Sequence, residues 1–322
     1  MRLMSSRRGF FFSVIAIYLV GALLLSASIK EYSGITSRGE VEKARVLSMN
    51  EFLKDVESDL ERGIYISGYR AIIGIEEYIL KNGEYIQDSN AAFRSAFLNG
   101  SVGNYSPEIL KGSTFPDWEE RISEKAAELN MQLKISNEEV EVMQDDPWNV
   151  KVIINLTITL SDTSGIASWN LTKQINSSIP IQDMEDPLFI VNSYGRVSRT
   201  IREAHSYSFV SGNSTLGLIE HLNQGYYIQS GTAPSFLMRL EGNLTSSEYG
   251  IESLVNISQL AAQGTLPRTA SIVDYIYFGN RTTSDICINN SIAEPDLPDW
   301  FRLDSDDSHD RVYQITAIGR GC

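Results

Sequence analysis

One segment near the C-terminus, DSDDSHD, has side chains that suggest metal binding. Its candidate ligands are Asp304, Asp306, Asp307, His309 and Asp310. Ca²⁺ takes oxygen ligands from such alternating carboxylates, but an EF-hand loop also needs a central glycine and a bidentate glutamate at its end, where Ile315 stands here. We therefore interpret the segment as a solvated turn, and we expect no metal site and no cofactor.

The sequence gives little support for catalytic chemistry. The three histidines, His205, His221 and His309, have no second histidine or cysteine at zinc-ligand spacing. The motifs HExxH, CxxC, GxxxxGKS/T and GxSxG are missing as well. Catalysis usually needs titratable groups gathered in one place, so we predict that the protein is not an enzyme. An exported hydrolase whose site the sequence does not reveal remains an alternative.

The sequence gives stronger evidence for N-glycosylation than for catalysis or metal binding, because it contains ten Asn-x-Ser/Thr acceptor motifs. Chance would give about three such triplets in a chain of this composition. The alternative is that asparagine, serine and threonine are simply abundant in loops. The ten candidate sites are Asn99, Asn104, Asn155, Asn170, Asn176, Asn213, Asn243, Asn256, Asn280 and Asn289.

The two cysteines, Cys287 and Cys322, are predicted to form a disulfide that ties down the C-terminal tail in an oxidising exterior. Two unpaired thiols, or a link from Cys322 to another chain, are the alternatives. The formal net charge of −14 argues against nucleic acid as a partner and against adhesion to anionic lipid headgroups.

An apolar run at 9–29, GFFFSVIAIYLVGALLLSASI, is expected to anchor the chain in a membrane. As a helix, such a run spans about 30 Å, the thickness of a bilayer core. We predict an uncleaved transmembrane helix with the lipid bilayer as its partner. The alternative is a cleaved signal peptide, for which Ser26 and Ser28 supply small residues near a cleavage point.

The orientation of this segment follows from the sequons rather than from the charges. Arg2, Arg7 and Arg8 precede the run, but Lys30 and further basic residues follow it, so the positive-inside count is nearly balanced. Glycans are added on the exported side. We therefore expect a cytoplasmic tail at 1–8 and a C-terminal ectodomain outside the cell membrane, in a single-pass arrangement.

Residues 30–130 are predicted to form a helical membrane-proximal region. One stripe with helical spacing contains Val46, Met49, Leu53, Val56 and Leu60. An apolar segment at 69–80 follows and ends at Asn82-Gly83, and a short helix is expected around 90–98. Proline in the first turn after Thr114 predicts a further helix that runs to about Asn130.

Residues 131–322 are predicted to form an antiparallel β-rich ectodomain. The segments 131–143, 148–160 and 166–181 alternate with a period of two, which predicts a three-stranded meander. The alternation places Asn155, Asn170 and Asn176 on the polar face. Beyond Asp186-Pro187 we expect short strands at 188–194, 235–240, 271–278 and 311–318, a short helix at 216–222 and a loop at 281–310. The predicted fold class is therefore α+β, with an N-terminal transmembrane helix.

The N-terminal sequence RRGFFFSVIAIYLVGALLLS resembles that of exported, membrane-anchored archaeal surface proteins with a pilin-like or signal-anchor N-terminus. The Gly9-Phe10 step after two arginines is similar to a class III prepilin processing site. Val14 stands where pilins usually have a glutamate, five residues after that step. The resemblance implies export and display on the cell envelope, and it implies nothing about the β region.

The sequence thus predicts a membrane-anchored, N-glycosylated cell-surface protein with a structural, adhesive or recognition role. Its expected partners are the bilayer and other envelope proteins or further copies of itself. A minor pilin or pseudopilin subunit of a surface filament or secretion system is the main alternative, and the exported hydrolase is the second.

Overall fold

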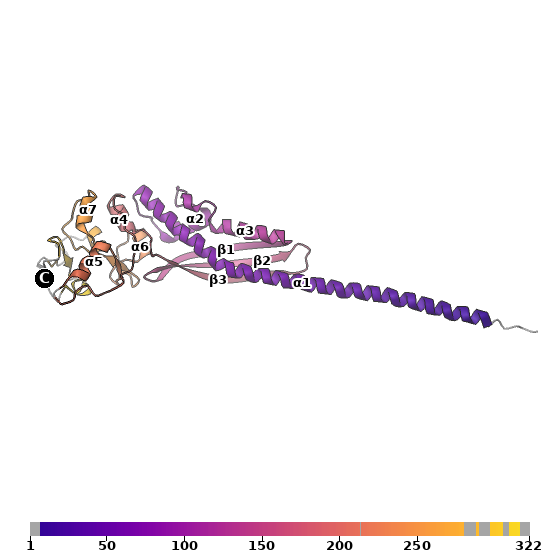
Figure 1. Ribbon diagram of the computed structural model, residues 1–322. Helices are drawn as coiled ribbons and strands as arrows, with labels where there is room; N and C mark the ends of the chain where they lie inside the picture. The colour runs from indigo at the N-terminus through magenta and orange to yellow at the C-terminus, as the bar shows by residue number, and fades with distance from the viewer. Residues whose placement is uncertain (1–6, 213, 280–287, 290–296, 305–308, 316–322) are drawn as a thin grey trace, which may run out of the picture.

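A computed structural model describes residues 7–212, 214–279, 288–289, 297–304 and 309–315. The side chains of 7–16, 27–38, 137–138 and 288–289 are not among those described. The chain folds into an elongated body from which the N-terminal part of one long helix projects (Figure 1). Helices and an antiparallel sheet occur together, so the predicted α+β class is confirmed.

The projecting helix, α1, is continuous from Arg7 to Asn82. Four of the five predicted stripe residues, from Met49 to Leu60, are buried against the body, and Val46 is half-buried at its edge. The helix ends where predicted, because Gly83 adopts a positive φ of 69° that is disfavoured for other residues. Within the part of the chain that has described side chains, no helix is both long and apolar enough to cross a membrane.

Three strands form the main sheet, in the order β1-β2-β3: β1 (Met131–Asp146), β2 (Asn149–Asp162) and β3 (Ser168–Pro180). The predicted meander is confirmed, with pairs such as Val142 opposite Val152. Its inner face is covered by α1, α2 (Ser89–Asn99) and α3 (Phe115–Glu128) (Figure 1), and the short helix η1 (Glu108–Leu110) packs against α1. The alternate apolar side chains of β2, from Val150 to Leu160, are fully buried on that face.

The outer edge of β1 is covered by side chains from α2 and α3. Asn90 Oδ1 accepts a hydrogen bond from Val142 N at 2.8 Å, and a carboxylate oxygen of Glu119 accepts one from Ile135 N at 2.9 Å. An open strand edge is a template for pairing with other chains. These contacts therefore protect β1 and fix the two helices against the sheet.

The distal part of the body contains mostly short helices. These are α4 (Pro187–Asn192), α5 (Leu216–Gln224), α6 (Phe236–Leu240), α7 (Ile257–Ala262), α8 (Asp274–Phe278) and α9 (His309–Val312). Two small antiparallel sheets pair β4 (Tyr227–Gln229) with β5 (Ile251–Ser253) and β6 (Ile288–Asn289) with β7 (Leu303–Asp304).

This distal organisation corrects four sequence predictions. The helix at 216–222 is confirmed as α5, but the expected strands at 188–194, 235–240, 271–278 and 311–318 are wrong where the structure describes them. A short apolar run does not distinguish a buried strand from a buried helix by periodicity alone. At 188–194 the local capping chemistry decides, because Asp186 accepts a hydrogen bond from Leu188 N at 2.9 Å and Pro187 begins the helix.

Candidate functional site

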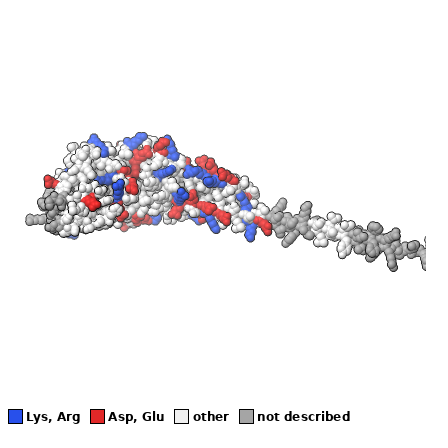
Figure 2. Space-filling model, viewed as in Figure 1, with Lys and Arg blue, Asp and Glu red and all other residues white. Residues whose placement is uncertain are grey.

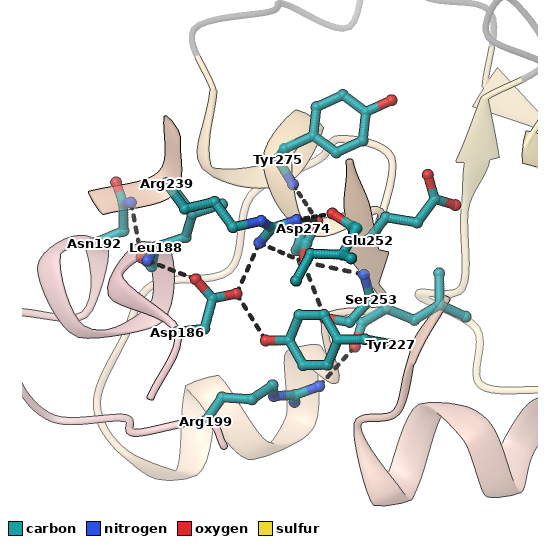
Figure 3. A network of polar contacts seen from close by, with 12 residues as sticks. Asp186, Leu188, Asn192, Arg199, Tyr227, Arg239, Glu252, Ser253, Asp274 and Tyr275 are labelled. Atoms are coloured by element: carbon teal, nitrogen blue, oxygen red, sulfur yellow. Dashed lines mark hydrogen bonds and ion pairs between the residues drawn. The ribbon is translucent and has the colours of Figure 1, made fainter. Parts of the chain in front are cut away.

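A group of completely buried charged side chains surrounds Arg239 of α6 (Figure 3). Its Nη1 donates to Asp186 Oδ2 at 2.7 Å and to Asp274 Oδ2 at 3.0 Å, and all three side chains are completely buried. Asp186 is the N-cap of α4, and Asp274 is the first residue of α8. One guanidinium thus joins the ends of two helices that lie far apart in the sequence.

Further hydrogen bonds complete this triad. The Tyr227 hydroxyl donates to Asp186 Oδ2 at 2.7 Å, and the backbone N–H and hydroxyl of Ser253 each donate to Asp274 Oδ2 at 3.0 Å. Burial raises the pKa of Asp274, although the charge of Arg239 opposes that shift. The carboxylates in turn raise the pKa of Arg239 in spite of its burial. Among the described residues Arg239 Nε has no hydrogen-bond partner, so one donor of the triad stays unsatisfied, and loss of any member would leave further buried polar atoms unpaired.

A second cluster surrounds His309 of α9. Its Nδ1 lies 2.7 Å from Asp304 Oδ2, and its Nε2 lies 3.2 Å from both Glu252 Oε2 and the Tyr275 hydroxyl. Burial alone lowers the pKa of this imidazole, but the hydrogen bonds and charges of the two carboxylates outweigh burial and raise it to about 10. His309 is therefore an imidazolium at neutral pH, held between two carboxylates.

The His309 cluster overturns the interpretation of DSDDSHD as a solvated turn. Asp304 and His309 are fully buried and Asp310 is nearly so, while Asp306 and Asp307 lie outside the described residues. The remaining oxygen of Asp304 accepts a hydrogen bond from the buried Ser271 hydroxyl. Among the described residues, no three His, Cys, Asp or Glu side chains are arranged to hold a metal ion.

The two clusters support a structural role better than an open catalytic site. A histidine, a carboxylate and a serine hydroxyl do come together at His309, but Ser271 bonds the carboxylate and not the imidazole. The side chains of this group are enclosed, so a substrate would reach them only if the surrounding helices opened. Glu252 and Ser253 are neighbours on β5, and through them the His309 cluster adjoins the Arg239 triad.

The other two histidines lie together at a small pocket of about 150 Å³. His221 is buried between Phe209 and Tyr313, and neither of its ring nitrogens has a hydrogen-bond partner among the described residues. Burial, aided by the charge of Arg199, lowers its pKa to about 4, so His221 is neutral at pH 7. His205 is exposed at the same pocket. No hydrogen bond between a carboxylate and either imidazole occurs within the described part.

The sequon asparagines fall into distinct environments. Asn170 and Asn176 are exposed on the open face of β3, whereas Asn155 on β2 is half-buried and accepts a hydrogen bond from Gln174 at 3.1 Å. Asn256 is buried, caps α7 through a bond from Gln259 N, and donates to Asn223. The exposed set also contains Asn99, Asn104 and Asn243. Asn213, Asn280, Cys287 and Cys322 lie outside the described residues, as does the side chain of Asn289.

Sequence reasoning missed the Arg239 triad, because its partners are 53 and 35 residues from the arginine. The one local signal was Asp186-Pro187, whose residue types favour the start of a helix. Comparison with known proteins adds no further guide, since no family model, no curated protein and no solved structure matches the chain.

Proposed function

We propose that the protein is a membrane-anchored cell-surface protein that displays its body outside the cell in a structural, adhesive or recognition role. The observation that carries this proposal is α1, a single helix that leaves the body and contains the whole apolar run at 9–29 (Figure 1). The anchor would be residues 9–29, with 1–8 on the cytoplasmic side. A rigid helical stalk would then hold the body away from the bilayer.

The exposed side chains of the projecting helix support this anchor. Ile17, Leu19 and Leu23 are 71%, 60% and 67% exposed. Apolar surface left in water costs about 25 cal/mol per Å², so such a helix needs a bilayer or a partner to cover it. The described side chains at 17–26 of this helix are uncharged, whereas the body carries interspersed charges of both signs (Figure 2). This contrast is consistent with an N-terminal segment of α1 in lipid and a body in water.

The open face of the sheet supports display outside the cell. Its β2 and β3 side chains are mostly polar, and it presents Asn170 and Asn176 to solvent. We propose these two asparagines as the preferred glycan acceptors, followed by Asn155. Asn256 is excluded from the proposal, because its buried side chain is already used to cap a helix.

The test combines protease accessibility with intact-glycopeptide mass spectrometry on native cells. Protease added outside should remove the body, and peptides with Asn170 or Asn176 should carry glycan while the Asn256 peptide does not. Asn170→Gln and Asn176→Gln should each remove one glycan mass, and Asn256→Gln is the matched control that removes none. A body protected from protease in intact cells would contradict the proposed display.

A filament subunit is the second candidate. It is favoured by the Gly9-Phe10 step after two arginines and by the unbroken path of α1 from that step into the body. Sequencing the mature N-terminus separates the candidates, because a chain that begins at Phe10 would select the filament subunit. A chain that retains Arg7 and Arg8 would select the simple anchor, and cleavage beyond Ser28 would contradict both.

A further inference from the structure

A pocket of about 220 Å³ lies between the middle of α1 and the first turns of α3. Three arginines line it: Arg62 and Arg70 from α1, and Arg121 from α3. In a chain with a net charge of −14, such a gathering of positive charge runs against the overall balance. None of its described lining residues belongs to the Arg239 triad or to the open sheet face.

The arginines of this pocket are largely uncompensated. Within the described structure Arg62 and Arg70 are exposed and have neither an ion pair nor a hydrogen bond. Arg121 uses one nitrogen to donate to Gly112 O at 3.1 Å. The one acidic side chain among the described lining residues is Asp59, which accepts a hydrogen bond from Trp118 Nε1 at 3.2 Å. The pocket therefore has an excess of positive charge and of unused N–H donors.

Ser67 of α1 adds a hydroxyl to the lining of the pocket. Its side chain lines the pocket, yet the residue is only 3% exposed. The described contacts include no hydrogen bond for its hydroxyl. The hydroxyl oxygen is not one of the fully enclosed polar atoms that lack a partner, so it is accessible from the pocket and can donate to a ligand oxygen there.

We propose that this pocket binds a tetrahedral oxyanion, a phosphate or sulfate group. Guanidinium groups form bidentate hydrogen bonds with such anions, and the Ser67 hydroxyl can donate a further bond from the floor of the pocket. The volume is below the range of 300–1,000 Å³ typical of drug-sized ligands, so it suits the anionic group itself.

Two sources share this chemistry: free inorganic phosphate or sulfate, and an ester group on an anionic polysaccharide of the envelope. A lipid phosphate is too distant if residues 9–29 are the anchor. Arg62 lies about 33 residues further along the same helix, and a rise of 1.5 Å per residue puts it about 50 Å from the bilayer.

The experiment is isothermal titration calorimetry on the full-length protein in nonionic detergent at low ionic strength. Separate arms use sodium phosphate, sodium sulfate and dextran sulfate, with sodium chloride and neutral dextran as blanks. The variants are Arg62→Gln, Arg70→Gln and Ser67→Ala. Lys54→Gln is the matched control, because Lys54 is an exposed basic residue of α1 outside the pocket.

Saturable binding should occur in wild type and Lys54→Gln, and each arginine variant should raise Kd about tenfold or more. Ser67→Ala should also weaken binding, by a smaller factor than the arginine variants. Saturable binding of inorganic phosphate or sulfate would identify the free ion as the ligand. Saturable binding of dextran sulfate alone would identify an ester group on a polysaccharide as the ligand. Heats equal in all variants, or no saturable binding in any arm, would overturn the proposal. Circular dichroism of each variant excludes unfolding as the cause of lost binding.

Discussion

Gly63 of α1 lies directly against the indole ring of Trp118 in α3, so that a Cβ at position 63 would stand only 2.7 Å from Trp118 Cε2. Gly68 has the same relation to Ile179 of β3, whose Cδ1 would also be 2.7 Å away. Glycine usually weakens a helix interior. Here the two glycines allow close packing on α1, and burial against the body keeps the helix continuous through them.

Gly63→Ala should therefore destabilise the body, although alanine is the better helix former. Atoms inserted into a packed contact typically cost about 1–3 kcal/mol, and the rigid indole of Trp118 has little freedom to move. The matched control is Gly39→Ala in the same helix, because no atom lies within 4 Å of a Cβ at position 39. Thermal unfolding should show a lower Tm for Gly63→Ala and an equal or higher Tm for Gly39→Ala. Equal shifts in both variants would show that the close contact with Trp118 is unimportant.

The proximal half of the body could be predicted because its elements have strong periodic signals. In β2 every second residue from Val150 to Leu160 is aliphatic, and the turns between strands contain Asp, Gly and Pro. The start of α3 could also be predicted, because Thr114 and Asp117 form a capping box and Pro116 lies in the first turn of the helix. What the sequence did not predict there was the length of α1, since Gly63 and Gly68 suggest a break unless Trp118 and Ile179 are known to pack on them.

The distal half could not be predicted for a different physical reason. Its described helices are four to nine residues long and its described strands two or three, so tertiary contacts decide their conformation. Asp274 shows this well: it begins α8 in a segment predicted as a strand, and its carboxylate is held by Arg239 from 35 residues away. Likewise the acidic stretch that begins at Asp304 has the composition of a solvent-exposed turn. Only the hydrogen bonds of Asp304 with Ser271 and His309 reveal that this first residue of the stretch is buried.

The buried triad predicts that Asp274→Ala will be strongly destabilising. The substitution removes one of the two carboxylates that pair with the buried Arg239, leaves only Asp186 to accept from its Nη1, and removes the acceptor for two donors of Ser253. Breaking a buried ion pair by removing one partner typically costs about 3–5 kcal/mol. Glu108→Ala is the control, since its ion pair with Lys111 is on the surface, with side chains 80% and 65% exposed. Chemical denaturation should show a large loss only for Asp274→Ala, and similar midpoints for both variants would contradict the role of the triad.

His309 predicts a loss of stability at alkaline pH. Its pKa is raised to about 10 in the folded protein, chiefly because the hydrogen bonds and charges of Asp304 and Glu252 outweigh burial. The unfolded value is about 6.5. Between these values the folded state binds more protons, so the stabilisation is complete below about pH 6.5 and is lost as the pH rises through about 10. In His309→Gln, Tm should be lower at pH 6.5 and should fall less steeply towards pH 10. A parallel pH dependence of the variant and the wild type would refute the assignment.

His221 predicts the opposite dependence, at acid pH. Burial and the nearby Arg199 lower its pKa to about 4 in the folded protein. Between about pH 4 and the unfolded value of about 6.5, the unfolded state binds the additional proton, so stability falls as the pH falls through this interval. His221→Phe keeps an aromatic ring against Phe209 and Tyr313 and removes two buried nitrogens that lack partners. Its Tm should therefore equal or exceed that of the wild type at pH 7, and the difference should grow in its favour at pH 4.5. If the variant instead loses stability as steeply as the wild type on acidification, another group is responsible for the acid sensitivity of this core.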